Sequence, residues 1–257
     1  MSYYCDKYVV TEKRTLAGGV FSVTVRAHDP SHEAHVGQFA NISADGFTLR
    51  RPISICEINK EAGTLRFVFE VRGKGTEAIS RVNVGETLDI LGPLGNGFRI
   101  PEGKRVIAVG GGIGVPPLLG IARSIGGLCT AILGFRSYDR IILADEFKAH
   151  GADTLICTDD GSVGFHGVVT SQLERELAKD DVGAVCACGP EPMIRAVAKL
   201  CLEKDVPCQI SLEQRMGCGV GACVVCSCLT VKNGAEWYSR VCKDGPVFDA
   251  KEVKFDG

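Results

Sequence analysis

The sequence predicts a multidomain α/β plus β protein with an antiparallel β domain, a doubly wound parallel-sheet domain and a small cysteine-rich domain. Short strand-like runs separated by turn residues fill the first hundred residues. Strand-like and helix-like segments then alternate to about residue 210, and the remainder is rich in cysteine and glycine. We therefore expect domains at residues 1–100, 101–210 and 211–257.

The first domain shows an antiparallel strand pattern between Tyr8 and Leu91. Its strand-like runs read GVFSVTVRA, GQFANIS, FTLRRPISICEI, TLRFVFEVRG and ETLDILG. Glycine, asparagine or proline separates several of them, at a spacing typical of a β-barrel or a β-sandwich. We expect one of these two all-β architectures.

The second domain begins near Pro101, where strands and helices alternate. We expect strands at 106–110, 129–135, 153–159 and 184–189, and helices at 118–125, 141–149, 168–178 and 191–203. The first strand is entirely apolar and enters a glycine-rich turn, and the alternation indicates a parallel sheet covered by helices. The alternation stops around Ser211. The last part is too short for an independent core, so we expect it to fold around a ligand.

Composition and charge exclude several functions. The chain has 257 residues, 45% of them hydrophobic and 23% charged, as in ordinary globular proteins. Its formal net charge of −2 provides no basic field, so we expect no nucleic acid and no membrane as partner. The start, MSYYCDKYVV, lacks a secretory signal pattern, and the uncharged run Val106–Ala122 is short and broken by glycines and prolines. We expect a cytoplasmic protein.

Five of the thirteen cysteines fall between Cys218 and Cys242. An odd number of cysteines without a secretory signal indicates free thiols or metal ligands rather than disulfides. Cys218, Cys223 and Cys226 follow the spacing C-x4-C-x2-C, and Cys242 comes after 15 intervening residues. This spacing is typical of plant-type 2Fe-2S ligation.

The glycines at 217, 219 and 221 support an iron–sulfur loop, because N–H groups that turn toward a cluster need backbone conformations that glycine reaches. A structural zinc site is the alternative, although zinc ribbons usually present two separate C-x2-C pairs. Cys228 is an alternative third ligand to Cys226, because side chains two residues apart in an extended segment point the same way.

Two further motifs occupy strand ends, where doubly wound sheets bind ligands. The glycine run from Gly110 to Gly114 connects an apolar strand to a helix, a context in which backbone amides can bind a phosphate. It departs from G-x-G-x-x-G because Val115 occupies the last glycine position. The segment that begins at Cys188 likewise ends a strand and starts a helix. Both motifs also have a structural interpretation, as a tight turn and as a buried thiol beside a helix cap.

Six short motifs form a combination along the chain. They are RPIS at 51–54, GT at 75–76, GGGIGVPP at 110–117, CGPEPM at 188–193, RMGCGVGAC at 215–223 and RVCKDGPVF at 240–248. Together they resemble the ferredoxin-reductase family and, within it, the electron-transfer subunits of class 1B dihydroorotate dehydrogenases. The resemblance covers nearly the whole chain and implies a β-barrel FAD-binding domain, an NAD-binding α/β domain and a C-terminal 2Fe-2S domain.

The resemblance also implies functional residues. Those that bind FAD or NAD are Arg51, Pro52, Ile53, Ser54, Val68, Phe69, Glu70, Gly75, Thr76, Gly110, Gly111, Gly112 and Gly114. Cys218, Cys223, Cys226 and Cys242 would hold the cluster, and Cys188 would be the catalytic residue near the nicotinamide and the flavin.

Three of these positions have a physical interpretation of their own. Arg51 suits the FAD pyrophosphate through a charge-assisted fork, with Arg50 as a nearby substitute, and Ser54 suits the flavin or its ribityl chain. Ile53 stands where the family usually has an aromatic residue. Arg136 could face the adenosine ribose, but it does not decide between NAD and NADP, and only the family favours NAD.

The implied activity is electron transfer. A nicotinamide carries two electrons as a hydride, a 2Fe-2S cluster accepts one at a time, and a flavin does both. The resemblance implies an oxidoreductase subunit that passes electrons from the FMN of a dihydroorotate dehydrogenase catalytic subunit through the cluster and FAD to NAD+, in pyrimidine (UMP) biosynthesis. It also implies a heterotetramer with two copies of each subunit.

Two alternatives remain. One is a related flavin and iron–sulfur NAD(P)H reductase subunit that serves a ferredoxin, sulfide or hydrogenase partner, and the other is a non-catalytic nucleotide-binding module with structural zinc.

His28, His32 and His35 suggest a separate metal site, but Pro30 and Gly37 in the same segment predict no regular face for it.

Overall fold

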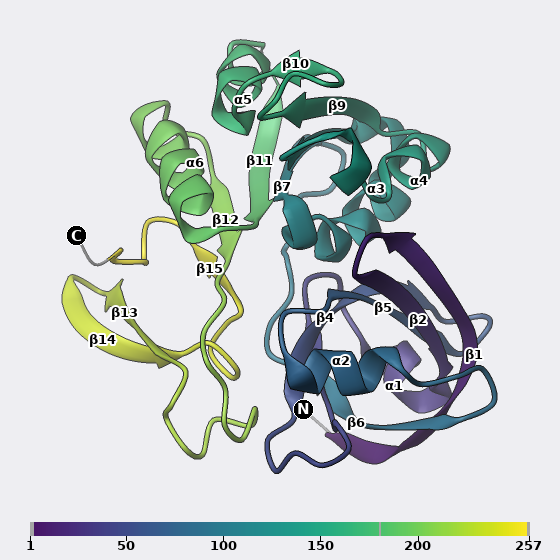
Figure 1. Ribbon diagram of the computed structural model, residues 1–257. Coiled ribbons are helices and arrows are strands. Elements are labelled where there is room, and N and C mark those ends of the chain that lie inside the picture. Colours follow the sequence, from purple (N-terminus) through teal and green to yellow (C-terminus); the bar gives the residue numbers. More distant parts are fainter. Residues whose placement is uncertain (1–2, 180, 256–257) are drawn as a thin grey trace.

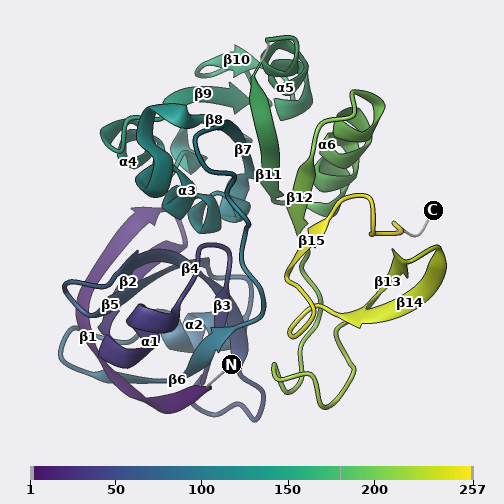
Figure 2. The same ribbon diagram turned by 180° about the vertical axis from the view of Figure 1, so that it is seen from behind.

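The computed structural model describes residues 3–179 and 181–255. Figure 1 shows a barrel and, next to it, a sheet flanked by helices, and Figure 2 shows the C-terminal segment alongside both. One hydrophobic cluster joins barrel residues such as Val20 and Val68 to sheet and helix residues such as Val106 and Leu118. The barrel and the sheet therefore share a core.

The first part is a closed antiparallel barrel with the strand order β1-β2-β5-β4-β3-β6. Its strands are β1 (Tyr4–Ala17), β2 (Val20–Arg26), β3 (Phe39–Ile42), β4 (Arg51–Asn59), β5 (Thr64–Glu70) and β6 (Thr87–Leu94). Side chains that point inward from these strands, such as Val23, Val25 and Phe67, have no exposed surface. The barrel is confirmed over the sandwich, and its closure gives each strand a neighbour on both sides.

Two short helices of the barrel domain have no clear signal in the sequence. Helix α2 (Lys74–Ser80) contains the Gly75-Thr76 motif, for which the sequence predicted no helix. Helix α1 (His28–Glu33) occupies the segment for which we expected no regular face, and that expectation is wrong. Pro30 is tolerated there because it lies in the first helical turn, where its missing N–H has no helical partner to lose.

Helix α1 brings two histidine rings together. The ring centroids of His28 and His32 are 4.6 Å apart, and His28 Nδ1 lies 3.1 Å from an oxygen of Asp29. Residues 3–179 and 181–255 nevertheless contain no group of three or more His, Cys, Asp or Glu side chains placed around a single metal position.

The second part is a seven-stranded sheet with the order β10-β9-β8-β7-β11-β12-β15. Its strands are β7 (Arg105–Gly111), β8 (Cys129–Phe135), β9 (Asp153–Thr158), β10 (Phe165–His166), β11 (Val182–Cys188), β12 (Cys208–Ser211) and β15 (Val247–Asp249). Its helices are α3 (Leu119–Ile125), α4 (Ala144–Ala149), α5 (Val169–Leu177) and α6 (Glu191–Glu203). All pairings except that of β12 with β15 are parallel, so the predicted doubly wound sheet is confirmed. No helix in the described residues is both long enough and apolar enough to cross a membrane.

The C-terminal segment packs against both other parts. It forms a hairpin of β13 (Ser227–Lys232) and β14 (Ala235–Arg240), then returns to the sheet as β15. A hydrophobic cluster unites barrel residues Phe39 and Leu94 with Cys226, Cys242 and Phe248. The cysteine-rich segment is therefore held by protein packing as well as by any ligand.

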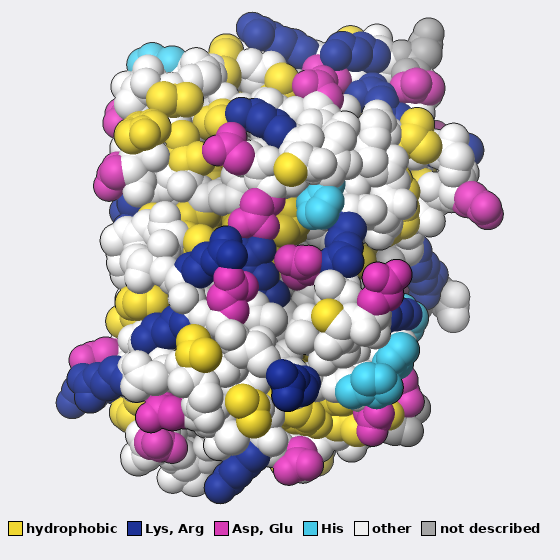
Figure 3. Space-filling view, turned by 90° about the vertical axis from the view of Figure 1, so that its right-hand side faces the viewer, with side chains coloured by type: hydrophobic (Ala, Val, Ile, Leu, Met, Phe, Trp, Pro, Cys, Tyr) yellow, Lys and Arg dark blue, Asp and Glu magenta, His cyan; other side chains and the backbone are white. Residues whose placement is uncertain are grey.

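Ion pairs also connect the barrel to helices of the sheet. Arg66 of β5 donates to the two oxygens of Glu146 in α4 at 2.5 and 3.0 Å and lies 3.4 Å from Glu57. Arg123 of α3 donates to the other Glu57 oxygen at 2.5 Å. Basic and acidic side chains gather across the middle of the face in Figure 3. Only 11% of the Arg66 side chain is exposed, so these carboxylates take the place of most of the water molecules that would otherwise solvate its charge.

Replacing Glu146 with alanine should destabilise the protein, because Arg66 would keep its buried charge with one weaker partner. We expect the free energy of unfolding, measured by urea denaturation, to fall by about 1–3 kcal/mol. The control is Glu77→Ala, which removes an exposed pair with Arg81 and should change it by less than about 0.5 kcal/mol. Equal losses in the two variants would contradict the role assigned to the Arg66 pair.

Candidate functional site

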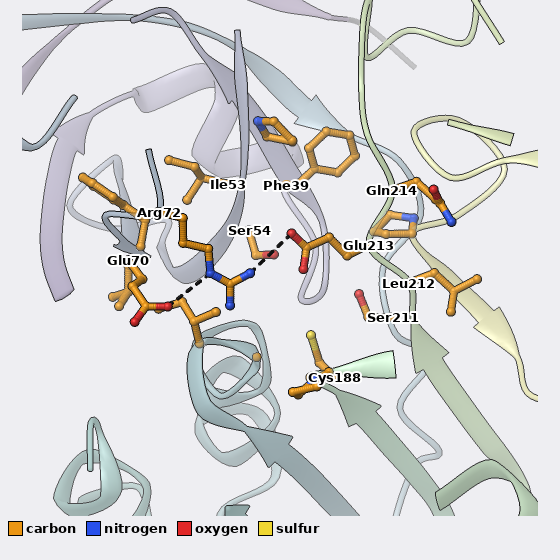
Figure 4. Close-up of a pocket in the computed structure, with 18 of the residues that line it drawn as sticks. Phe39, Ile53, Ser54, Glu70, Arg72, Cys188, Ser211, Leu212, Glu213 and Gln214 are labelled. Carbon is orange, nitrogen blue, oxygen red and sulfur yellow. Dashed lines mark hydrogen bonds and ion pairs between the residues drawn. The ribbon is translucent and has the colours of Figure 1, made fainter. Parts of the chain in front are cut away.

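The barrel, the sheet and the C-terminal segment meet at a cavity of about 290 Å³ (Figure 4). Strands β4 and β5 and helix α2 line it from the barrel, and the turn after β7, the end of β11 and the linker after β12 line the opposite side. The predicted site residues that line it are Pro52, Ile53, Ser54, Val68, Phe69, Glu70, Thr76, Gly111, Gly114 and Cys188. The fold thus gathers motifs that lie far apart in the sequence.

Arg51 and Gly75 do not line this cavity, although they touch each other. The Arg51 guanidinium is so close that a Cβ on residue 75 would lie 2.1 Å from its Nε, so a side chain there would displace the guanidinium. Arg51 also donates to the Leu49 carbonyl at 2.5 Å. Arg50 forms an ion pair with Asp89 at 2.9 Å, and this pair within the barrel argues against its acting as a substitute for Arg51.

Close packing shapes the glycine turn after β7. A Cβ on Gly114 would lie 2.4 Å from the Cys188 carbonyl oxygen, and a Cβ on Gly110 would lie 2.8 Å from the Val115 side chain. Gly110 therefore packs against Val115 outside the cavity, whereas Gly114 lines the cavity. Gly112 is required for a different reason, because its φ is +53°, while a Cβ on it would meet no atom of the described residues within 4 Å.

A second cavity, of about 1080 Å³, adjoins the first at Gly111. Gly112 lines it together with Arg136 and Arg140, which follow β8. Arg140 is neutralised by a short ion pair with Glu70, whereas Arg136 extends into an exposed position. An elongated cavity with arginines and a glycine turn suits a dinucleotide with its pyrophosphate.

Cys188 lies where three parallel strands end. It is level with Gly110 of β7 and Ser211 of β12. Burial raises the pKa of the Cys188 thiol to about 12, while a hydrogen bond with Ser211 lowers it in part and the charge of Glu213 raises it. The thiol is therefore neutral at physiological pH. It suits packing and weak hydrogen bonding beside a flavin or nicotinamide ring rather than nucleophilic attack.

Sequence reasoning missed several residues that line the first cavity. They are Phe39, Arg72, Ile113, Ser211, Leu212, Glu213, Gln214, Met216 and Pro246. Phe39 pairs with Ser54 across β3 and β4, so it brings to the cavity an aromatic ring that Ile53 lacks. Arg72 donates to Glu70 at 3.1 Å and lies 3.9 Å from Glu213, which links the barrel to the linker after β12 (Figure 4). Phe39 could be assigned to a strand from its apolar run, but no sequence signal gives its register.

The four cysteines predicted to hold the cluster form two pairs. The Cys218 N–H donates to Cys223 Sγ at 3.3 Å, and the Cys223 N–H donates to Cys218 Sγ at 3.4 Å. The Cys242 N–H donates to Cys226 Sγ at 3.4 Å. A 2Fe-2S cluster takes four thiolates, two on each iron, so this two-by-two arrangement fits it.

Backbone N–H groups converge on the Cys218 sulfur. Val220 and Ala222 donate to it at 3.4 and 3.3 Å, in addition to Cys223. Burial opposes ionisation, but these hydrogen bonds prevail and lower the pKa of Cys218 to about 6. The thiolate form that a metal requires is thereby favoured. Gly219 and Gly221 make the loop possible with φ values of +77° and +83°.

Cys228 and a zinc site fit less well. Cys228 pairs with Ser239 inside the β13–β14 hairpin, and burial raises the pKa of its thiol to about 11. It takes no part in the N–H···S bonds that connect Cys218 with Cys223 and Cys226 with Cys242. Zinc ribbons usually present two separate C-x2-C pairs, which this segment lacks, whereas the two-by-two pairing of the four cysteines suits a diiron cluster.

Comparisons with known proteins agree with this geometry. Residues 213–254 match the family model for the iron–sulfur cluster binding domain of dihydroorotate dehydrogenase B. The dihydroorotate dehydrogenase B (NAD(+)) electron transfer subunit of Caldanaerobacter subterraneus subsp. tengcongensis is 40% identical over 248 residues, which cover 96% of this chain and 97% of the relative. The subunit of the same name from Bacillus caldolyticus is 40% identical over 258 residues, with 96% and 98% covered.

Solved structures give the same result for the fold. The structure of an NADH-dependent reduced ferredoxin-NADP oxidoreductase superposes with a TM-score of 0.85 at 33% identity, covering 96% of this chain and 89% of that one. The ferredoxin reductase of carbazole 1,9a-dioxygenase has a TM-score of 0.68 at 21% identity, covering 80% and 68%, and shows the fold alone. On these similarities over nearly its full length, the chain belongs to the family of dihydroorotate dehydrogenase B electron transfer subunits.

Proposed function

We propose that this chain passes electrons from the FMN of a dihydroorotate dehydrogenase catalytic subunit, through a 2Fe-2S cluster and FAD, to NAD+ in pyrimidine biosynthesis. The observation that carries the proposal is one cavity lined by the barrel, the glycine turn, Cys188 and the linker to the cysteine loop. FAD supplies the exchange between two-electron and one-electron chemistry when it is bound there.

The chain's own residues bind and orient the two nucleotides. Ser54 offers its hydroxyl group to FAD from the barrel side, and the wall formed by Val68, Phe69 and Ile53 excludes water. Thr76 lines the same side, where its hydroxyl caps the start of α2 by donating to the Gly73 carbonyl. Arg51 lies outside the cavity, and we infer that it holds the start of α2 in place. NAD+ fits the adjoining cavity, where the glycine turn faces its pyrophosphate and Arg136 faces its adenosine end.

The cysteine loop holds the cluster close to the flavin site. Cys218 and Cys223 would ligate one iron and Cys226 and Cys242 the other, as their pairing suggests. Met216, two residues before Cys218, lines the first cavity, which we assign to FAD and call the flavin cavity. Electron transfer needs short distances, and the placement of Met216 supports a direct transfer between the two groups.

The catalytic partner would dock at the outer side of the cysteine loop. Cys223 is exposed there, and the neighbouring Val224 and Val225 expose apolar side chains. These features support a contact surface for the FMN-containing subunit. Only the family resemblance favours an assembly with two copies of each subunit. The cysteines of the described residues form no disulfides, which supports the expected cytoplasmic location. We infer functional domains at 1–100, 101–210 and 211–257, with β15 tying the third to the second.

A second candidate is a related reductase subunit that serves a ferredoxin. The 33% identity to the NADH-dependent reduced ferredoxin-NADP oxidoreductase structure favours it. Copurification separates the two: oxidation of dihydroorotate with NAD+ by the isolated complex supports the first function, and a complex that reduces only ferredoxin supports the second.

Replacing Cys223 with serine should remove a thiolate from one iron. We expect dihydroorotate oxidation by NAD+ in the reconstituted complex to be abolished, while NADH oxidation by artificial acceptors through FAD continues. The matched control is Cys228→Ser, which should keep both activities and two irons per chain. Full complex activity in Cys223→Ser, or its loss in Cys228→Ser, would contradict the ligand assignment.

Replacing Cys188 with alanine should slow hydride transfer without loss of FAD, because the thiol packs where the two rings meet. Stopped-flow reduction of the flavin by NADH should be about 10- to 100-fold slower. In the unmodified protein, a plot of this rate against pH should show no inflection due to Cys188 below about pH 10, because a pKa of about 12 keeps its thiol protonated. Cys5→Ala, at an exposed cysteine of β1, is the control. An unchanged rate in Cys188→Ala would refute the assignment.

A further inference from the structure

Asn41 of β3 is buried without a hydrogen-bond partner for its side chain. It is 1% exposed, and neither Nδ2 nor Oδ1 bonds to any group of the described residues. Among the buried side-chain nitrogen and oxygen atoms of residues 3–179 and 181–255, these two are the ones without a partner. Because native proteins pair nearly all such groups, the amide calls for a partner that is not part of the chain.

The unpaired amide faces the cysteine loop. Its Nδ2 lies against the backbone of Gly219, so close that a Cβ on this glycine would be only 2.0 Å away. Gly219 directly follows Cys218, whose sulfur already accepts N–H bonds from Val220, Ala222 and Cys223. The amide therefore lies beside the turn that surrounds this sulfur.

The flavin cavity is a less suitable source of the missing partner. Phe39, on the same face of β3, lines that cavity, as does Pro52, which pairs with Asn41 across the strands. Asn41 itself is not among the lining residues. Leu94 also packs beside Gly219, because a Cβ on Gly219 would lie 3.4 Å from the Leu94 side chain.

We propose that Asn41 is a positioning residue for the iron–sulfur cluster, and that its amide N–H donates to the sulfur atoms on the Cys218 side of the cluster. This inference rests on the proposed function, because it assumes a 2Fe-2S cluster in the loop. Reduction of the cluster adds one negative charge, and an N–H donor stabilises the more negative form. Asn41 therefore raises the reduction potential of the cluster and holds its loop on the barrel.

The test is an anaerobic redox titration of Asn41→Leu in the full chain with FAD and cluster bound, followed by electron paramagnetic resonance. At a fixed applied potential, the ratio of reduced to oxidised cluster should fall about fivefold or more, as for the loss of one hydrogen bond. The flavin spectrum and its reduction rate by NADH should stay unchanged. Asn41→His, which keeps an N–H donor, should restore the ratio toward that of the unmodified protein.

Asn96→Leu is the control for a merely structural effect. Asn96 lies at the same junction and donates to the Lys243 and Asp244 carbonyls at 3.2 and 3.0 Å, so its loss should lower stability without changing the cluster potential. An unchanged ratio in Asn41→Leu, an equal shift in Asn96→Leu, or a shift of the flavin potential instead would overturn the inference. If Asn41→Leu does not retain iron, Asn41→Ala, which also lacks a side-chain donor, is titrated by the same criterion.

The two proposals fail in different ways. An unmodified protein that holds FAD but no paramagnetic diiron centre would contradict the proposed function. A normal cluster in the unmodified protein, with the same potential in Asn41→Leu, would contradict only the role of Asn41.

Discussion

Strands β7, β11 and β12 end at one level, and the contact between their ends determines the site. Gly110, Cys188 and Ser211 are in register there, and Gly114 packs against the Cys188 carbonyl at a distance that excludes any side chain. This contact holds the glycine turn against the end of β11. The flavin cavity, the nucleotide cavity and the linker to the cysteine loop all start from this edge, as expected for a doubly wound sheet.

The barrel can form one wall of the cavity only if it keeps a constant position relative to this edge of the sheet. A shared hydrophobic core and the Arg66 ion pairs hold it on the sheet, and the Glu70–Arg72–Glu213 chain spans the cleft itself. The hydrophobic cluster around Phe39 and Leu94 fastens the cysteine segment to the barrel. Packing thereby places the cysteine segment next to the first cavity, as the proposed short-range electron transfer requires.

The cysteine loop shows how backbone geometry prepares a metal site. Positive φ angles at Gly219 and Gly221 turn N–H groups toward the Cys218 sulfur and favour its thiolate. The second pair, Cys226 and Cys242, is buried in the same hydrophobic cluster that reaches the flavin cavity through Phe39. Cys223 of the first pair is thus exposed at the surface, whereas the second pair lies in the protein interior.

Local patterns in the sequence were enough for the antiparallel strands of the first domain, the alternating strands and helices, and the C-x4-C-x2-C loop, because each depends on periodicity or on short spacing. They left a barrel and a sandwich open, and the barrel followed only from the family resemblance. Strand 129–135 and helix 191–203 agree with the structure residue for residue. The sequence alone could not show that α1 and α2 form, that β15 joins the sheet, that Arg51 packs under α2 while Arg72 and Phe39 reach the cavity, or that Asn41 faces Gly219. Those features depend on strand register and on contacts between segments far apart in the chain, which only tertiary packing decides.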